Sequence, residues 1–194
     1  MGITTSRTKA HWNYFLALER DIERISRYIE ISEDNFSVYS LELAHTLFAA
    51  SSEVDTVAKI LCEKARPGSG CANMMQYREL IMESIPEFSG TEVYIPRYGL
   101  TLTPWSNWNE GKSPDWWRSY NQVKHERDTH FNQATLKNTL NSMGALLVMV
   151  LNYYSYLFMV EDGVLGIKRA IRELEPGSNL LFLNDELYPK ILTS

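Results

Sequence analysis

An almost uncharged apolar run, residues 143–160 (MGALLVMVLNYYSYLFMV), is the feature that most limits how this chain can fold. Its eighteen residues approach the ~20 that a membrane span needs, so the run is either such a span or a helix buried on all sides. Asn152, Ser155 and three tyrosines lie in its middle and second half, where a bilayer would leave polar groups poorly satisfied. We therefore favour the central helix of a bundle, with a membrane span as the alternative.

Amphipathic segments elsewhere in the chain would surround such a central helix. From residue 8 to 31, apolar side chains recur at steps of three and four, and charged residues occupy the other face. A second apolar stripe follows a turn, with Asn35 or Ser37 as the expected N-cap. We predict core helices at about 8–31, 37–65, 114–130 and 134–160, a shorter helix at 73–85, and a short helix with a tail over 164–194.

Between residues 87 and 111 the helical period disappears. Apolar residues alternate with other residues there, as they would in a small hairpin: Val93, Ile95, Leu100 and Leu102. We therefore predict a single all-α domain over residues 1–194. Its architecture is an up-and-down bundle of about four main helices, with an inserted loop or small β-hairpin near 90–104.

Bulk properties narrow the function. The 194 residues carry a net charge of −5, which argues against a broad basic surface for duplex nucleic acid but allows a local phosphate site. Cys62 and Cys71 are too few for a disulfide framework, and we expect structural thiols or a pair that approaches around the intervening Pro–Gly turn. No apolar run follows the first residues, so we expect no secretory signal and a cytoplasmic protein.

Polar residues with the spacing of a reactive site follow Ser113–Pro114, which is a predicted helix start with Ser113 as N-cap. On a helix, Arg118, Asn121 and His125 lie at i, i+3 and i+7 and share one face. Arginine suits phosphate, imidazole can accept and return a proton near neutral pH, and an amide can orient either group. The neighbouring candidates for substrate contacts are Trp117, Lys124 and Arg127.

An all-α bundle with Arg, then four to six residues, then His on a late helix resembles the HEPN superfamily (higher eukaryotes and prokaryotes nucleotide-binding). Here the motif runs from Arg118 to His125, with six intervening residues. The family often places Asn directly after the Arg, whereas this chain has Ser119 there and Asn two positions later, at 121. The resemblance covers the helices from 8 to 65 and from 113 to 160.

The resemblance implies a function. Many HEPN proteins are metal-independent endoribonucleases of toxin–antitoxin, phage-defence or CRISPR systems, and their active sites form where two motifs meet across a homodimer. In this chain, His125 would move the proton of a ribose 2′-OH or of the leaving oxygen. Arg118 would stabilise the phosphorane, and Asn121 would orient the histidine or the phosphate.

Cleavage of this kind leaves 2′,3′-cyclic phosphate ends and uses no metal or cofactor. The implied partners are RNA or a nucleotide, a second copy of the chain and a cognate antitoxin protein. Other HEPN proteins bind nucleotides or partners without catalysis. A non-catalytic helical module that uses the same pocket is therefore the alternative.

Other polar and aromatic residues have plainer explanations. His125, Glu126 and His130 do not match the HExxH pattern, because three residues separate the last two, and we expect no metal site. His45 lies on the apolar stripe of the second helix and is expected to be a hydrogen-bonded core residue. Glu53 is expected to form a surface or interhelical ion pair, with support of the site as the alternative. Base stacking is an alternative to loop packing for four tryptophans: Trp105, Trp108, Trp116 and Trp117.

Overall fold

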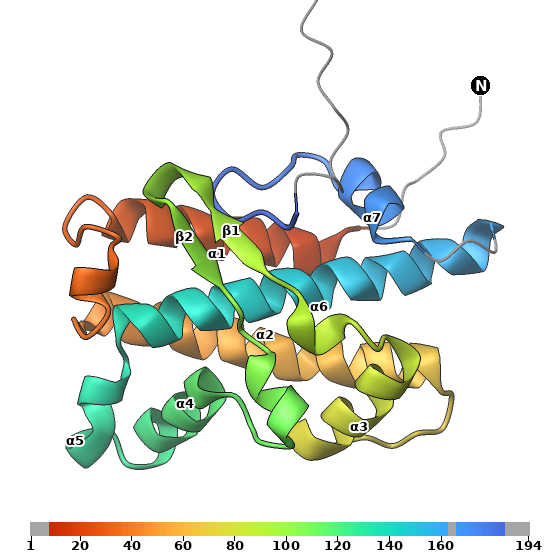
Figure 1. Cartoon of the computed structure of the whole chain (residues 1–194), viewed down its shortest axis with the longest axis horizontal. Coiled ribbons are helices and arrows are strands. Elements are labelled where there is room, and N and C mark those ends of the chain that lie inside the picture. The colour runs from red at the N-terminus through yellow and green to blue at the C-terminus, as the bar shows by residue number, and fades with distance from the viewer. Residues whose placement is uncertain (1–7, 163–165, 185–194) are drawn as a thin grey trace, which may run out of the picture.

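Helices make up most of the chain, and one short hairpin is inserted among them (Figure 1). The computed structural model describes residues 8–162 and 166–184. The α-helices in this part are α1 (Ala10–Ile25), α2 (Leu41–Ala65), α3 (Met74–Ser84), α4 (Asp115–His125), α5 (Arg127–His130), α6 (Leu136–Asp162) and α7 (Ile167–Glu173). The strands are β1 (Val93–Ile95) and β2 (Leu100–Leu102). The predicted helical class and hairpin are confirmed, and the up-and-down arrangement of four helices stays a prediction.

Helix α6 lies at the centre, packed against α1, α2, α4, α7 and strand β2. Every residue from 142 to 152 is buried. By length and composition, residues 136–159 could cross a membrane, but 78 % of the apolar window within them is buried inside the protein. This burial fits the predicted central helix of a bundle. The cytoplasmic location stays a prediction.

The polar groups of α6 have partners within the protein. The Asn152 side-chain amide donates to the Val148 carbonyl (2.8 Å), and the Ser142 hydroxyl donates to the Thr139 carbonyl (2.8 Å). The Thr139 hydroxyl reaches across to the Leu43 carbonyl of α2 (3.1 Å). Each such group would cost about 1–3 kcal/mol if it were buried without a partner. The helix can therefore carry polar residues and still be buried.

Two helix boundaries differ from the prediction near the chain start. Helix α1 ends at Ile25 rather than near residue 31, because the chain then turns with short-range bonds such as Tyr28 N–H to the Ile25 carbonyl (2.9 Å). Helix α2 starts at Leu41 rather than near 37. Its N-cap is Ser40, whose hydroxyl accepts from the Leu43 N–H (3.2 Å).

Neither predicted cap of α2, Asn35 or Ser37, fills that role, because the segment before Ser40 has another partner. The N–H groups of Leu136 and Lys137 donate to carbonyls of this segment, at 2.8 and 3.2 Å. Because these carbonyls accept from the first turn of α6, they are not free to start α2 earlier in the chain. This pairing fixes where α6 begins and therefore where its first exposed side chains lie.

The hairpin lies over α6, and the C-terminal segment pairs with it (Figure 1). Val93 pairs with Leu102 in antiparallel register. Backbone bonds also link Tyr94 and Phe182 in both directions, at 2.7 and 2.9 Å. The C-terminal segment therefore docks on the hairpin through Phe182, and residues 185–194 lie outside the described part.

A buried carboxylate ties the same C-terminal segment to α1. Glu19 is only 2 % exposed. Its oxygens accept from the N–H groups of Asn179, Leu180 and Leu181, each at 3.0 Å, and from the Ser178 hydroxyl. Several donors around one buried carboxylate are what make its burial tolerable.

Glu19→Ala is expected to destabilise the fold by about 1–3 kcal/mol or more, because it leaves buried backbone N–H groups without an acceptor. Hydrogen exchange at residues 179–181 should rise with it. Glu23→Ala, on the same helix and without an ion pair among the described residues, is the control. Urea unfolding measures both, and equal stability of the two variants would contradict the role given to Glu19.

Candidate functional site

Helix α4 is amphipathic and turns its motif residues toward solvent. Its buried residues are Trp116, Ser119, Tyr120 and Val123, which recur at steps of three and four. They pack against α2 and α6. Arg118 and His125 lie on the opposite face, and both are exposed, as the predicted helical spacing requires.

The ends of α4 correct two predictions. Pro114, not Ser113, occupies the N-cap position, and no side chain caps the helix. The predicted helix over 114–130 is interrupted at Glu126, where φ is −137°, and a single turn, α5, follows. Beyond Val123 no residue up to 130 is buried, so no packed face holds a continued helix in place.

The two principal motif residues do not meet within this chain. Arg118 pairs with Asp115, one turn toward the start of α4, and both side chains are 65 % exposed. Among the described residues, His125 makes no side-chain hydrogen bond or ion pair. The two residues are seven positions apart, which is about 10 Å along the helix axis. Arg118 therefore points away from His125.

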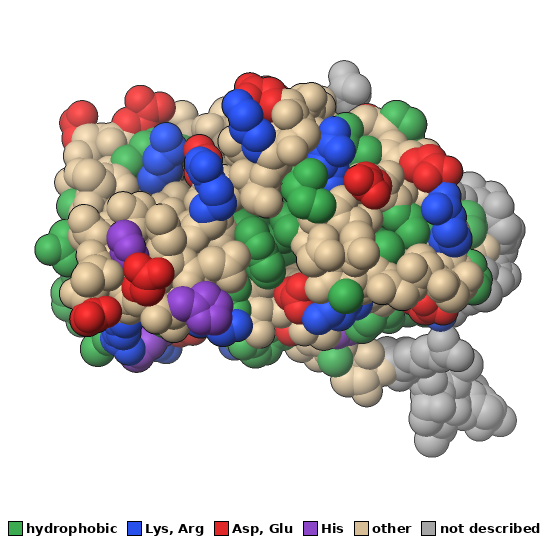
Figure 2. Space-filling model, turned by 90° about the horizontal axis from the view of Figure 1, so that it is seen from below, with side chains coloured by type: hydrophobic (Ala, Val, Ile, Leu, Met, Phe, Trp, Pro, Cys, Tyr) green, Lys and Arg blue, Asp and Glu red, His purple; other side chains and the backbone are tan. Residues whose placement is uncertain are grey.

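The other predicted site residues contact neighbours close to them in the chain. The Asn121 side-chain amide donates to the Trp117 carbonyl one turn back (3.1 Å), and Trp117 is half-buried against Tyr120 (5.2 Å between ring centroids). Lys124 bonds to the Tyr120 hydroxyl (3.2 Å), and the Arg127 guanidinium lies 5.2 Å from the Phe131 ring centroid. Figure 2, in which the molecule is seen from below, shows histidine side chains gathered at the end where α4 and α5 lie.

A polar trough runs between α4 and the first turns of α6. It consists of two adjoining hollows, of about 420 and 190 Å³, which share Asp115, Lys137 and Asn138. The larger hollow also contains Arg118, Ser119, Gln122 and Gln133. The smaller one adds residues of the loop before α4 and of α6: Thr103, Pro104, Ser106, Asn107, Trp116 and Asn141. Of the predicted site residues, only Arg118 lines the trough.

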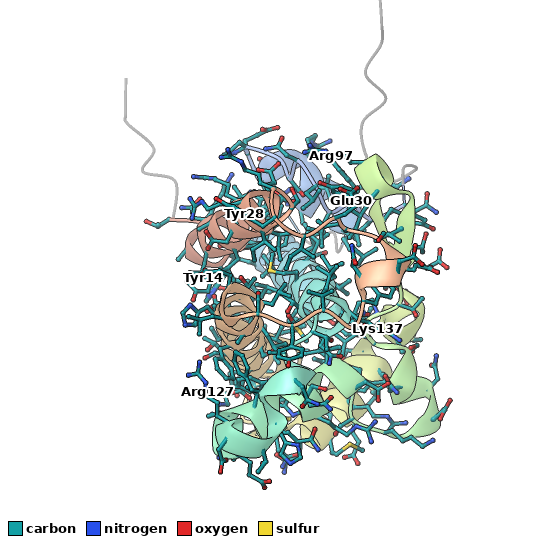
Figure 3. The ribbon with its side chains drawn as sticks, turned by 90° about the vertical axis from the view of Figure 1, so that its left-hand side faces the viewer. Tyr14, Tyr28, Glu30, Arg97, Arg127 and Lys137 are labelled. Carbon is teal, nitrogen blue, oxygen red and sulfur yellow. The ribbon has the colours of Figure 1, made fainter. Side chains whose placement is uncertain are left out.

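Sequence reasoning missed Lys137 and Asn138. Lys137 is exposed and, within the described part of the chain, has no side-chain hydrogen bond or ion pair. Figure 3 shows it at the end of the molecule where α6 begins, apart from Arg127. Its backbone N–H is held by the Phe36 carbonyl (3.2 Å). The only sign of these two residues in the sequence is a cluster of polar residues at the start of a helix. Such a cluster does not indicate which element packs beside it.

A second hollow, of about 530 Å³, lies between α1 and α2 and contains His45, Tyr28 and the Asp21–Arg24 ion pair. His45 is exposed there, so its predicted place in the core is wrong. The apolar stripe of α2 passes beside it, through Ala44 and Leu47, and leaves the imidazole on the rim. None of the motif residues of α4 lines this hollow.

The expected role of Glu53 is confirmed. Its carboxylate pairs with His11 Nδ1 of α1 (2.5 Å), and both side chains are largely buried between helices. It lies among α1, α2 and the ring of Tyr153 on α6, which contacts His11 edge-on at 5.4 Å. Among the described residues, no three His, Cys, Asp or Glu side chains gather closely enough to hold a metal ion.

The tryptophans of the long loop and of the first turn of α4 pack rather than face solvent. Trp105, Trp108 and Trp116 are at most 2 % exposed. Trp105 and Trp108 lie 4.3 Å apart between ring centroids, and the Trp116 indole N–H donates to the Pro104 carbonyl (2.8 Å). Packing, which was favoured over base stacking, is thus confirmed for these three. They anchor the loop that forms one wall of the trough.

The two thiols lie next to each other at the end of α2, and neither is in a disulfide. Burial raises the pKa of Cys62 from 9.0 to about 12, and the adjacent Cys71 adds to the rise. Burial likewise raises the pKa of Tyr154 to about 12. Cys62 is therefore a neutral core residue, as expected of a structural thiol.

No known family model, curated protein sequence or solved structure matches this chain.

Cys62 should make the protein less stable at high pH. The pKa of this thiol is higher in the folded than in the unfolded chain. Its contribution to the free energy of unfolding is therefore complete below pH 9.0 and is lost as pH rises toward 12. The free energy of unfolding should fall less steeply above pH 9.0 in Cys62→Ala than in wild type. Urea titrations at several pH values measure this, with Cys71→Ala as the control that retains the buried thiol. Parallel slopes in all three proteins would contradict it.

Proposed function

We propose that this protein is a HEPN-like, metal-independent endoribonuclease. The observation that carries the proposal is the exposed face of α4, where Arg118 and His125 both face solvent and Arg118 also lines the polar trough. A fixed cation and an accessible imidazole are the two groups that RNA transesterification needs. In this proposal, helices α1, α2, α4 and α6 correspond to the four core helices of the family.

The chemistry follows from these two side chains. The His125 imidazole takes the proton of a ribose 2′-OH, and the 2′-oxygen attacks the adjacent phosphorus. Arg118 stabilises the charge on the phosphorane oxygens, and the bond to the 5′-oxygen breaks. The leaving 5′-oxygen takes a proton from an imidazolium, which leaves a 2′,3′-cyclic phosphate and a 5′-hydroxyl. Asn121 orients the imidazole or the phosphate once it leaves the Trp117 carbonyl.

Arg118 must leave Asp115 to reach a phosphate. The two side chains are exposed, and an ion pair of this kind contributes only about 0–1 kcal/mol. A phosphate dianion or phosphodiester offers stronger, charge-assisted bonds to a guanidinium. The pair seen here is therefore compatible with a resting position of Arg118.

In a dimer, a second copy of the chain would bring an Arg118 and a His125 together. Across a two-fold axis near α4, the arginine of one copy would lie beside the histidine of the other, as in HEPN homodimers. Lys124, Arg127 and Trp117, around the same surface, would contact the RNA strand. Such an exposed site would also need control in the cytoplasm, which suits a toxin–antitoxin or phage-defence role with an antitoxin that covers α4.

One observation favours the alternative of a non-catalytic module. The trough contains Arg118 and Lys137 but not His125. A nucleotide could bind there through its phosphate and several side-chain amides without meeting a general base. In that case the protein would bind nucleotides or a partner and cleave nothing.

Purified protein should cleave single-stranded RNA in EDTA, and His125→Ala and Arg118→Ala should each lose about 10²–10⁴-fold in rate, as expected for a general acid–base or a charge-stabilising group. End analysis should find 2′,3′-cyclic phosphates. Lys64→Ala, at the far end of α2, is the control for a lost surface charge. Equal residual cleavage by wild type and both motif variants would exclude this site as the source of activity.

Asp115→Asn should raise the cleavage rate at subsaturating RNA by up to about fivefold, because it removes a competitor for Arg118 worth at most about 1 kcal/mol. The gain should vanish in an Arg118→Ala background. Asp128→Asn, an exposed carboxylate on α5, is the charge-matched control. A gain of the same size in the control would show that net charge, and not release of Arg118, is responsible.

A further inference from the structure

We propose that the polar trough between α4 and α6 binds a ribose–phosphate unit of RNA. The Lys137 ammonium contacts a phosphate, and the side-chain oxygen of Asn138 accepts a hydrogen bond from a ribose 2′-OH. The choice of RNA rests on the proposed function, but binding in the trough does not require cleavage. The residues that carry the inference lie on α6, outside the Arg118–His125 motif.

The charge of the trough favours a phosphate. Lys137 lies on the wall that both hollows share, and Arg118 lines the larger hollow. Among the described residues that line the trough, Asp115 is the only carboxylate, so two cations face one anion in a chain whose net charge is −5. Arg118 is already paired with that carboxylate. Within the described part of the chain, Lys137 is thus the unpaired cation of the trough, and a lysine acts on phosphate as a point charge.

Side chains, and not the end of helix α6, would hold the anion. The N–H groups of Leu136 and Lys137 are bonded to carbonyls of the segment before α2. The Asn138 and Thr139 N–H groups bond to the hydroxyl and the carbonyl of Thr135. These first amides of α6 are therefore occupied, and Lys137 is left as the group that can bind a phosphate.

Asn138 presents an acceptor in a fixed orientation. Its side-chain nitrogen donates to the Ser119 hydroxyl (3.0 Å) and to the Gln133 carbonyl (2.9 Å), so both amide hydrogens are engaged. The side-chain oxygen remains to accept a hydrogen bond, and its position is set by the two bonds on the nitrogen. A ribose 2′-OH can donate to that oxygen, and deoxyribose cannot.

The dimensions and the lining suit one nucleotide unit. The larger hollow, of about 420 Å³, falls in the lower range of small-molecule sites, and the adjoining hollow is about 190 Å³. Further amides line the trough at Gln122, Asn107 and Asn141. Such side chains can bond to base edges or sugar hydroxyls of a single strand. Arg118 belongs to both the trough and the motif, so the bound unit would lie next to the scissile phosphate.

The test uses His125→Ala protein, which is not expected to cleave, and a fluorescent single-stranded RNA with a DNA of the same sequence. We expect RNA to bind about tenfold or more tightly than DNA in anisotropy titrations. Lys137→Ala should weaken RNA binding and lower the slope of log K against log salt by about 0.7, the value for one phosphate contact on a single strand. Lys64→Ala should change neither quantity.

Asn138→Ala should weaken RNA binding and leave DNA binding unchanged. Because Asn138 also bonds to Ser119 and Gln133, this variant could unfold locally, and a second measurement avoids that problem. The unaltered His125→Ala protein is titrated with 2′-O-methyl RNA, which keeps the phosphates but has no 2′ donor. It should bind as weakly as DNA does.

Equal binding of RNA, DNA and 2′-O-methyl RNA would overturn the role of Asn138. An unchanged salt slope in Lys137→Ala would overturn the trough as the phosphate site. Neither result would affect cleavage that depends on Arg118 and His125. Conversely, RNA binding that depends on Lys137 in a protein that cleaves nothing would uphold this inference and defeat the proposed ribonuclease.

Discussion

Burial of helix α6 is the constraint on which the rest of the structure depends. A run of eighteen residues with almost no charge cannot remain exposed to water, and its burial is worth far more than any single polar contact in the protein. Helices α1, α2 and α4 and the hairpin each cover part of it. The hairpin lies against α6 at Gly144, where a Cβ atom would stand 3.5 Å from the Val93 side chain.

The candidate site is a consequence of this packing. Helix α4 docks through one apolar stripe, so its other face, with Arg118 and His125, must point to solvent. The start of α6 is held by backbone pairing with residues 36–38, which brings Lys137 and Asn138 to the wall opposite Arg118. The buried tryptophans fix the loop at the other end of the trough. A rigid core thus supports an exposed polar surface.

The sequence predicted the elements of the site better than their assembly. The helical period alone places Arg118 and His125 on one face, and the structure agrees. It could not show that Arg118 turns back to Asp115, because side-chain pairing on an exposed helix depends on small energy differences. It also placed His45 in the core, since a position at the edge of an apolar stripe can face either way until the neighbouring helix is known.

By itself, the sequence determined the helical class, the hairpin near 90–104, the buried run of α6 and the polar face of α4. These follow from local periodicity and turn chemistry, which a chain carries in consecutive residues. Only the tertiary structure decided three features: the trough, the hydrogen bonds from residues 178–181 to Glu19, and the exact residues at which the helices begin and end. Each of these features depends on contacts between residues far apart in the chain. Such contacts are set by the packing of whole elements, which the local sequence pattern does not specify.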